Sequence, residues 1–318
     1  MAKVVTPLEL RQRHGPLFAR RLITMVDERT GRARIVEECC AQGPVEWDAV
    51  NRLRAGGVVE HVEVQGTTLL MDARIGEGKV NFGPASKETG GQALRALQVK
   101  GGKVETTWMG LAGASVGVGA CLPQADGVEK AEFLSDEEVG GSRQVEIRIT
   151  TPLHRRLLIG IDDTDTKEKG ATWVLGLKLG REMPHGVFLT HKIVQLNPLA
   201  PQKTTNCAST ALAFAVLPEK VGEAIKWAKQ FVAENTFSGE TVLASYEGIE
   251  VPAAAVRFGA EAKEVILSIH DAEHAAKKSG ISIHEVTGRR GAIGAVAAIG
   301  CVDLGLYSAG LPDDFKHL

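Results

Sequence analysis

The stretch LLIGIDDTDTKEKG, residues 157 to 170, decides how the second half of the chain is organised. Its apolar beginning predicts a buried β-strand that ends in three carboxylates, Asp162, Asp163 and Asp165. Two like charges about 7 Å apart repel by roughly 2 kcal/mol at an effective dielectric constant of about 20. If the cluster is partly buried it requires a counter-ion, and Mg²⁺ with substrate phosphates is suited to that role. The alternative is a solvated turn whose aspartates cap backbone N–H groups.

A loop stiffened by two prolines follows the next predicted strand. The sequence LNPLAPQKTTN, residues 196 to 206, contains Asn197, Lys203, Thr204 and Asn206. Lysine can act as a point charge on phosphate, while amide and hydroxyl groups can donate hydrogen bonds to it. A rigid connecting loop with a solvated lysine would give the same pattern.

A third segment, GRRGAIGAVAAIG at residues 288 to 300, combines glycine with arginine. Glycines at three-residue spacing enclose two arginines: Gly288, Arg289, Arg290, Gly291 and Gly294. Such glycines let backbone N–H groups approach an anion, and the N-terminus of a following helix would favour negative charge. They also permit close packing, and the alanine-rich continuation fits a tightly packed helix or a buried strand. Together the three segments supply a metal site, charge clamps and backbone donors, as phosphoryl transfer requires.

In this order the three segments resemble the ATP-dependent kinase-like domain of archaeal tRNA-isoleucine agmatinylcytidine synthetase, over roughly residues 156–310. That enzyme activates a wobble cytidine with ATP and joins agmatine to it. The full chain, with ATWVLGLKLG at residues 171–180, more closely resembles methanogenesis marker protein 11. That family of archaeal methanogens shares the kinase-like domain.

The resemblance implies ATP and Mg²⁺ as cofactors and a defined set of site residues. The set comprises Mg²⁺ ligands Asp162, Asp163 and Asp165, catalytic residues Asp163, Asp165 and Thr172, and ATP-binding residues Asn197, Lys203, Thr204, Asn206, Gly288, Arg289, Arg290, Gly291 and Gly294. The synthetase has paired threonines after the glycine, one of them an autophosphorylation site. This chain departs from that pattern, since residues 170–173 read GATW and contain one threonine.

Alternating strand and helix signals predict an α/β (α+β) fold with mixed sheets in two domains. We expect an N-terminal α+β domain at residues 1–152 and a nucleotide-binding, kinase-like domain at residues 153–318. The boundary is placed at Pro152, where an alternating strand pattern stops, and the acidic stretch 135–142 before it is a candidate linker.

Several elements are predicted within these domains. Hairpins are expected at residues 21–40 and 59–75, and a helix at 86–99 with Ser86 as its N-cap. Helices in the second half are expected at residues 171–182, 218–234 and 260–278. The Gly/Ala-rich segment 110–123 fits a strand pair packed against a helix, or a place where the backbone contacts a ligand.

Charge is balanced, with 37 Lys and Arg against 39 Asp and Glu, and aromatic residues make up 5% of the chain. Neither half has the basic excess typical of a phosphate-backbone binder, and few aromatic side chains can stack on bases. The OB-fold and cysteine zinc ribbon that the synthetase resemblance would bring have no counterpart in the sequence. We therefore do not expect tRNA as a partner.

The cellular setting follows from hydropathy and cysteine usage. No run of about 18 apolar residues is present, which argues against a membrane span. The N-terminus lacks the long apolar centre of a secretory signal. Five cysteines without a C-x-x-C pair indicate a reducing, cytoplasmic environment. We expect Cys121, Cys207 and Cys301 to be buried free thiols, and His270 and His274 to lie on a solvated helix face rather than to bind metal.

Two functional hypotheses follow. In the first, the protein is a Mg²⁺-dependent, ATP-using phosphotransferase or ATP-activating modification enzyme linked to methanogenesis. In the second, it is a non-catalytic, nucleotide-responsive assembly or maturation factor that contacts a protein partner of the methane-forming machinery. A positioned base or acceptor would distinguish the first hypothesis from the second.

Overall fold

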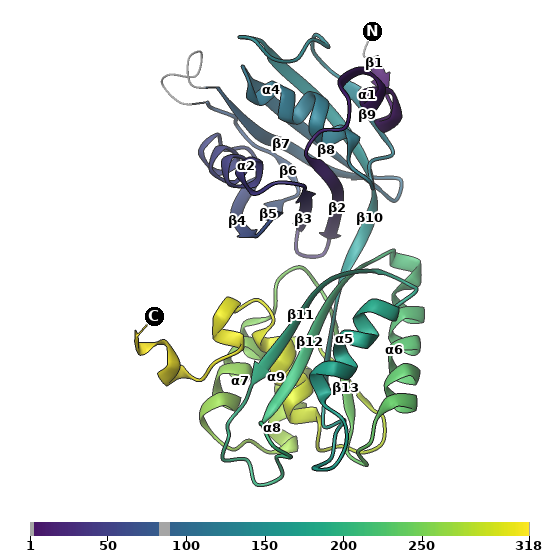
Figure 1. The fold of residues 1–318 in the computed structure, drawn as a ribbon, viewed down its shortest axis with the longest axis vertical. Helices are drawn as coiled ribbons and strands as arrows, with labels where there is room; N and C mark the ends of the chain where they lie inside the picture. Colours follow the sequence, from purple (N-terminus) through teal and green to yellow (C-terminus); the bar gives the residue numbers. More distant parts are fainter. Residues whose placement is uncertain (1–2, 83–89, 318) are drawn as a thin grey trace. The chain divides into compact units, whose positions relative to one another are not determined.

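The computed structural model describes residues 3–82 and 90–317 (Figure 1). Its contacts divide the chain into two compact units, Met1–His154 and Arg155–Leu318. The division thus falls just after the position of Pro152. Within the described residues, no helix is both long and apolar enough to cross a membrane.

The N-terminal unit consists mainly of antiparallel strands. Its strands are β1 (Lys3–Val5), β2 (Ala19–Asp27), β3 (Arg32–Cys39), β4 (Val59–Gln65), β5 (Thr68–Arg74), β6 (Gly76–Glu77), β7 (Gly91–Lys100), β8 (Lys103–Leu111), β9 (Lys130–Phe133) and β10 (Gln144–Asp162). Its helical segments are α1 (Pro7–His14), α2 (Gln42–Arg54), α4 (Ala114–Val116), a π-helical turn (Gly117–Cys121) and a 3-10 turn (Leu122–Gln124). The strands pair in the order β4-β5-β3-β2-β10-β8-β7-β6, and β10 joins β2 in parallel, so the sheet is mixed.

Two predictions for this unit differ in outcome. Both hairpins are confirmed, as β2–β3 and β4–β5. The helix predicted at residues 86–99 is wrong from Gly91 onward, where β7 pairs with β8. The alanine, leucine and glutamine residues of this segment are good helix formers, but sheet pairing overrides their propensity. Ser86, the expected N-cap, lies outside the described residues.

The Gly/Ala-rich segment 110–123 is helical after the end of β8, so the predicted strand pair is wrong. A Cβ atom on Gly110 would lie 2.6 Å from Val118 Cγ2 and 2.8 Å from Ser115 Cα. The small residue therefore lets the helical turns lie directly against the strand.

Strand β10 continues through Pro152, so the predicted strand end at this residue is wrong. The proline faces Lys103 at the last β8–β10 pair, and the next residue, Leu153, already pairs with β2. Because proline has no N–H to donate, it fits where a strand changes partners. The acidic stretch 135–142 lies between β9 and β10 inside the first unit, so it does not link the two units.

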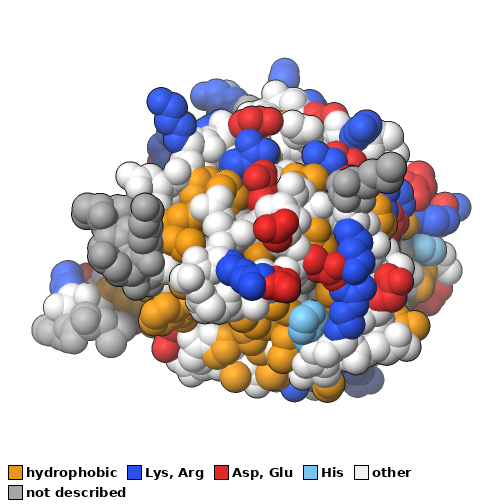
Figure 2. All heavy atoms as spheres, turned by 90° about the horizontal axis from the view of Figure 1, so that it is seen from above, with side chains coloured by type: hydrophobic (Ala, Val, Ile, Leu, Met, Phe, Trp, Pro, Cys, Tyr) orange, Lys and Arg blue, Asp and Glu red, His pale blue; other side chains and the backbone are white. Residues whose placement is uncertain are grey.

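Lys and Arg side chains lie beside Asp and Glu side chains on the face shown in Figure 2. Basic and acidic side chains also pair on the strands of the N-terminal unit. Arg34 Nε lies 2.6 Å from Asp72 Oδ1, and Arg148 Nη1 lies 2.8 Å from Glu132 Oε2. The described residues on this face therefore form a mixed-charge surface rather than a basic one.

The C-terminal unit is a sheet covered by helices on both faces (Figure 1). Besides the end of β10, its strands are β11 (Val187–Gln195), β12 (Ala208–Val216), β13 (Val242–Glu247) and β14 (Ser282–Glu285). Its helices are α5 (Thr172–Glu182), α6 (Val221–Asn235), α7 (Ala253–Glu264), α8 (Ile269–Ser279) and α9 (Ala292–Cys301), with 3-10 turns at Pro218–Lys220, Gly305–Ser308 and Pro312–His317. The strand order is β11-β12-β10-β13-β14, and each neighbouring pair is antiparallel.

The helices at 171–182 and 218–234 are confirmed as α5 and as a 3-10 turn that leads into α6. The alanine-rich run after residue 291 is a helix, α9, rather than a strand. The single helix predicted at 260–278 is wrong: α7 ends at Glu264, and Ser268 begins α8 with a capping box to Asp271. The serine hydroxyl satisfies a backbone N–H group that would otherwise lack a partner, which fixes a new helix start.

Alternate residues of β10 face the two helical layers. Leu157, Ile159 and Ile161 pack with α5 and α6, whereas Leu158 packs with α7, α8 and α9. Gly160 is the point of closest approach, because a Cβ atom there would lie 2.0 Å from the carbonyl oxygen of Ala295 in α9. The absence of a side chain at Gly160 thus sets the distance between α9 and the central strand.

Replacing Gly160 with alanine should lower the free energy of unfolding of the C-terminal unit by about 3 kcal/mol, since α9 must move away from β10. Gly222 in α6 is a matched control, because a Cβ atom there meets no atom within 4 Å. Gly222→Ala should be neutral or stabilising by up to about 1 kcal/mol. Urea denaturation of both variants measures the difference, and equal effects would contradict the proposed close contact.

Candidate functional site

The end of β10 turns sharply at Asp163, whose φ of 59° lies in the left-handed region that non-glycine residues rarely adopt. Three contacts hold this conformation. Arg290 donates from Nε to Asp163 Oδ2 at 2.6 Å and from Nη2 to Oδ1 at 3.1 Å, and Thr241 Oγ1 donates to the Asp163 carbonyl at 2.7 Å. Backbone strain that is fixed by several contacts is common at functional sites.

A loop that the sequence analysis did not identify, residues 236–241, supports this turn. Thr236 Oγ1 donates to the Thr164 carbonyl at 3.2 Å, and Ser238 Oγ donates to Asp163 Oδ1 at 3.0 Å. The same loop holds the Gly-Arg segment, because Glu240 Oε2 accepts the backbone N–H groups of Arg289 and Arg290 at 3.2 and 3.1 Å. These hydrogen bonds lower the pKa of Glu240. The signal in the sequence is the run TFSGET between a helix and a strand.

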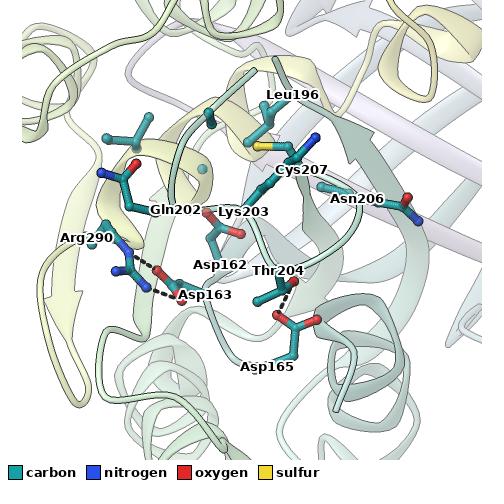
Figure 3. Close-up of a pocket in the computed structure, with 14 residues that line it drawn as sticks. Asp162, Asp163, Asp165, Leu196, Gln202, Lys203, Thr204, Asn206, Cys207 and Arg290 are labelled. Carbon is teal, nitrogen blue, oxygen red and sulfur yellow. Dashed lines mark hydrogen bonds and ion pairs between the residues drawn. The ribbon is translucent and has the colours of Figure 1, made fainter. Parts of the chain in front are cut away.

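A cavity of about 110 Å³ opens beside the turn (Figure 3). Eight of the predicted site residues line it: Asp162, Asp163, Asp165, Lys203, Thr204, Asn206, Arg290 and Gly294. Thr204 Oγ1 donates to Asp165 Oδ1 at 3.4 Å, which joins the lysine loop to the aspartate turn. Ile293 and Gly294 bring the first turn of α9 to the wall, and a helix N-terminus favours an anion.

Asp162 and Asp165 do not share the two-contact arginine pairing that Asp163 has with Arg290. Burial raises the pKa of Asp162 well above its usual range, and the adjacent Asp163 carboxylate raises it further. Burial also raises the pKa of Asp165. A bound cation would favour the ionised forms of both groups and reverse these shifts.

The thiol of Cys207 lines the same cavity and is half-buried. Burial, with a contribution from Asp162, raises its pKa to about 11. The group is therefore a neutral thiol at neutral pH, as expected of a structural cysteine rather than a nucleophile. Cys121 and Cys301 are buried free thiols, as predicted, whereas the prediction that Cys207 is buried is wrong, because this thiol is only half-buried.

A metal ion at this cavity would have few protein ligands. Within residues 3–82 and 90–317, no group of three His, Cys, Asp or Glu side chains is arranged to hold a metal ion. Asp163 is engaged by Arg290, whereas Asp162 and Asp165 face the cavity with raised pKa values. One or two carboxylates, with water and substrate phosphates, are a usual shell for Mg²⁺, so the residues fit this ion.

Five predicted site residues lie outside the cavity lining: Thr172, Asn197, Gly288, Arg289 and Gly291. Thr172 is buried at the start of α5, and its Oγ1 accepts the Thr164 hydroxyl at 3.0 Å. Asn197 shapes the lysine loop by accepting from Leu199 N at 2.9 Å and donating to the Glu264 carbonyl at 3.0 Å.

The remaining three belong to the Gly-Arg segment. Arg289 points to acidic residues outside the cavity, pairing with Glu273 at 2.5 Å and Glu285 at 2.9 Å. A Cβ atom on Gly288 would lie 2.4 Å from the Gly239 carbonyl oxygen, and one on Gly291 2.8 Å from that of Asp162. These two glycines therefore allow close backbone packing.

Comparison with known proteins finds a family model that matches part of the second unit. Residues 158–223, from the end of β10 to the beginning of α6, match the TiaS TCKD domain. Over nearly its whole length the chain is similar to Uncharacterized protein MJ0921 of Methanocaldococcus jannaschii, with 36% identity over 299 residues, which cover 93% of this chain and 97% of that protein. The chain belongs to the same family as that protein.

Similarity to the synthetases is confined to part of the chain. The tRNA 2-agmatinylcytidine synthetase TiaS of Pyrococcus horikoshii is 38% identical over 154 residues, covering 45% of this chain and 35% of that enzyme. The crystal structure of a complex of TiaS with its tRNA and ATP is 27% identical over 46% of this chain and 36% of its own, with a TM-score of 0.41. The chain thus spans about a third of the length of these synthetases.

Replacing Asp162 with asparagine should remove a pH dependence of stability. The raised pKa means that the folded protein binds this proton more tightly than the unfolded chain, so wild-type stability falls as pH rises above the unfolded value. The stability of Asp162→Asn relative to wild type should therefore increase with pH, by up to about 1.4 kcal/mol per pH unit. Urea denaturation between pH 5 and 8, without metal or nucleotide, measures it.

Asp271 provides a matched control, because its pKa is lowered by hydrogen bonds from the Ser268 side chain and backbone. Above pH 5 this group is ionised in both folded and unfolded chains, so the effect of Asp271→Asn should not vary with pH. A pH-independent difference for Asp162→Asn as well would contradict the buried-carboxyl assignment.

Proposed function

We propose that the C-terminal unit binds ATP together with Mg²⁺ and that the protein is an ATP-using phosphotransferase or ATP-activating modification enzyme. The observation that carries this proposal is the convergence of three distant segments on one cavity. The aspartate turn supplies carboxylates, the lysine loop supplies Lys203, and the start of α9 supplies a helix N-terminus with Arg290. A cation site beside anion-binding groups suits a metal–phosphate complex.

The size of the cavity indicates which part of the nucleotide would enter it. Small-molecule pockets usually measure about 300–1,000 Å³, whereas this cavity measures about 110 Å³. It can hold a metal ion with a phosphate group, so the base and ribose would lie outside its mouth. Lys203 lines the cavity, and its Nζ donates to the Pro198 carbonyl at 2.5 Å, a partner that it would exchange for phosphate.

The carboxylates would have different roles. Asp162 and Asp165 would hold Mg²⁺, which neutralises phosphate charge when bound. Asp163 would contribute less to the metal and more to orienting Arg290, because its two oxygens accept the guanidinium. A bidentate guanidinium fixed in this way can present its remaining donors to a phosphate.

The sequence similarity to ATP-using synthetases supports the enzyme class. The TiaS enzymes of Pyrococcus horikoshii and Thermococcus sibiricus are 38% and 35% identical to this chain in the matched region. The resemblance to methanogenesis marker protein 11 favours an activity in the cytoplasm of a methanogen.

One observation favours the second candidate, a nucleotide-responsive assembly factor. Neither the threonine predicted as a catalytic residue nor the cysteine that lines the cavity is reactive as placed. The Thr172 hydroxyl is buried and bonded to Thr164, and the raised pKa of Cys207 keeps its thiol protonated. An acceptor would then come from a substrate or partner, or be the Thr204 hydroxyl, which lines the cavity and donates to Asp165.

The expectation that tRNA is not a partner has no support from the comparisons, since the solved TiaS structures include complexes with tRNA. The balanced charge of this chain gives it no general attraction for nucleic acid. Recognition of a particular tRNA would instead depend on local contacts. We propose a small-molecule or protein substrate first, and tRNA as the alternative.

Separate substitution of the two arginines tests the proposed ATP site. Arg290→Ala should weaken Mg-ATP binding at least tenfold, about 1.4 kcal/mol, because Arg290 lines the cavity and fixes Asp163. Arg289→Ala should leave affinity within about twofold, since its ion pairs lie outside the cavity. Isothermal titration calorimetry measures both affinities.

Arg289 is a matched control for Arg290, because the two residues are adjacent in the sequence and carry the same charge. Equal losses for the two variants would indicate a non-specific charge effect. Unchanged Mg-ATP affinity for Arg290→Ala would contradict the phosphate-binding role, as would folded wild-type protein that does not bind Mg-ATP.

A further inference from the structure

A second cavity, of about 480 Å³, lies within the N-terminal unit. Its walls are formed by the start of α2, the start of β7 and the turn between β8 and α4. The volume falls in the range of small-molecule sites, which is about 300–1,000 Å³. Most of the lining is apolar side chain or glycine backbone, including Phe18, Pro44, Trp47 and Val116.

Two polar side chains line this cavity, Asp48 and Gln92, and both are buried, with 3% and 1% of their surfaces exposed. Asp48 is the one charged residue among the lining residues described. Gln92 Nε2 donates to Asp48 Oδ1, and Arg52 Nη2 donates to Asp48 Oδ2 at 3.1 Å. The carboxyl group of Asp48 is therefore held in one orientation at the cavity wall.

Behind Asp48 the buried charges do not balance. Arg52, which is 1% exposed, also pairs with the buried Glu37, and its guanidinium lies 4.7 Å from the centre of the Trp108 ring. One guanidinium thus faces two carboxylates, which leaves an excess of one negative charge when both are ionised. Buried charges without full compensation are costly, so the site favours a further cation or a proton.

The direction of the Asp48 pKa shift agrees with this excess of negative charge. Burial raises the pKa of Asp48, and Glu37 raises it further, while Arg52 and the Gln92 amide lower it. The nearby thiols of Cys39 and Cys121 do not add charge near neutral pH, because burial raises the pKa of each. Asp48 is consequently the group whose charge state a ligand in the cavity would alter.

We propose that this cavity is a ligand site for a small organic cation, a primary ammonium group on an apolar body, with Asp48 as the counter-charge. The ammonium group would lie at Asp48, where it replaces the missing positive charge, and the body would contact Trp47, Phe18 and Val116. An anion is disfavoured because its charge would face Asp48, with Glu37 behind it. The proposal does not depend on nucleotide binding by the C-terminal unit.

Three probes of one shape test the charge preference on the full chain: 3-phenylpropylamine, 3-phenylpropan-1-ol and 3-phenylpropanoate. Isothermal titration calorimetry at pH 7.5 should show the amine binding at least tenfold more tightly than the alcohol, and the acid weakest. Asp48→Asn should weaken amine binding at least tenfold and abolish its advantage over the alcohol. Equal affinities for the three probes, or a preference for the acid, would overturn the proposal.

A cavity-filling variant tests the location without altering the charge cluster. Gly43 is the second residue of α2 and lines the cavity, and a Cβ atom there meets no atom within 4 Å. Gly222, the second residue of α6 in the other unit, is equally open and serves as the matched control. Gly43→Leu should abolish amine binding with an unchanged melting temperature, whereas Gly222→Leu should leave amine binding intact. Amine binding that survives Gly43→Leu in a folded protein would overturn the assignment.

Discussion

Helix α9 and strand β10 approach closely at two glycines, and the site depends on this contact. Gly160 on the strand and Gly294 on the helix each lack the Cβ atom that would separate the two elements. At Gly294 that atom would lie 2.0 Å from Asp162 Oδ2, so the carboxylate sits directly on the first turn of α9. The same approach places Arg290, just before the helix, within reach of Asp163.

Both units contain buried carboxylates that outnumber the cations beside them. The groups around each cluster determine which kind of ligand could bind there. In the C-terminal unit, three aspartates line one cavity with Arg290, Lys203 and a helix N-terminus, so both a cation and an anion can be accommodated. In the N-terminal unit, Glu37 and Asp48 share Arg52 beneath an apolar cavity. That arrangement suits an organic cation, because the Asp48 carboxylate at the cavity wall would repel a phosphate.

Local sequence was sufficient to identify the aspartate turn, the lysine loop and the Gly-Arg segment, but their contacts depend on tertiary pairing. The loop at 236–241 was missed because its partners, Asp163 and Thr164, are more than 70 residues away in sequence. Register places them together: Asp162 pairs with Val242 across β10 and β13, so the residues before Val242 must lie beside the turn.

The same limit explains the errors in secondary structure. The segment containing β7 is rich in helix-forming residues, yet it pairs with β8, and no local pattern reveals that partner. Pro152 suggested a strand end because the pattern of residues cannot show that β10 changes partners there. The roles of Gly288 and Gly291 likewise became clear only from the backbone atoms that approach them.

We propose that the metal ion of bound Mg-ATP supplies the positive charge that Asp162 and Asp165 lack. Titration of the full chain with Mg-ATP at pH 6.5, in two buffers of different ionisation enthalpy, tests it most directly. Binding should release protons, because a bound cation lowers the raised pKa values of Asp162 and Asp165. The measured enthalpy should then differ between the buffers. No binding, or binding with the same enthalpy in both buffers, would contradict the claim.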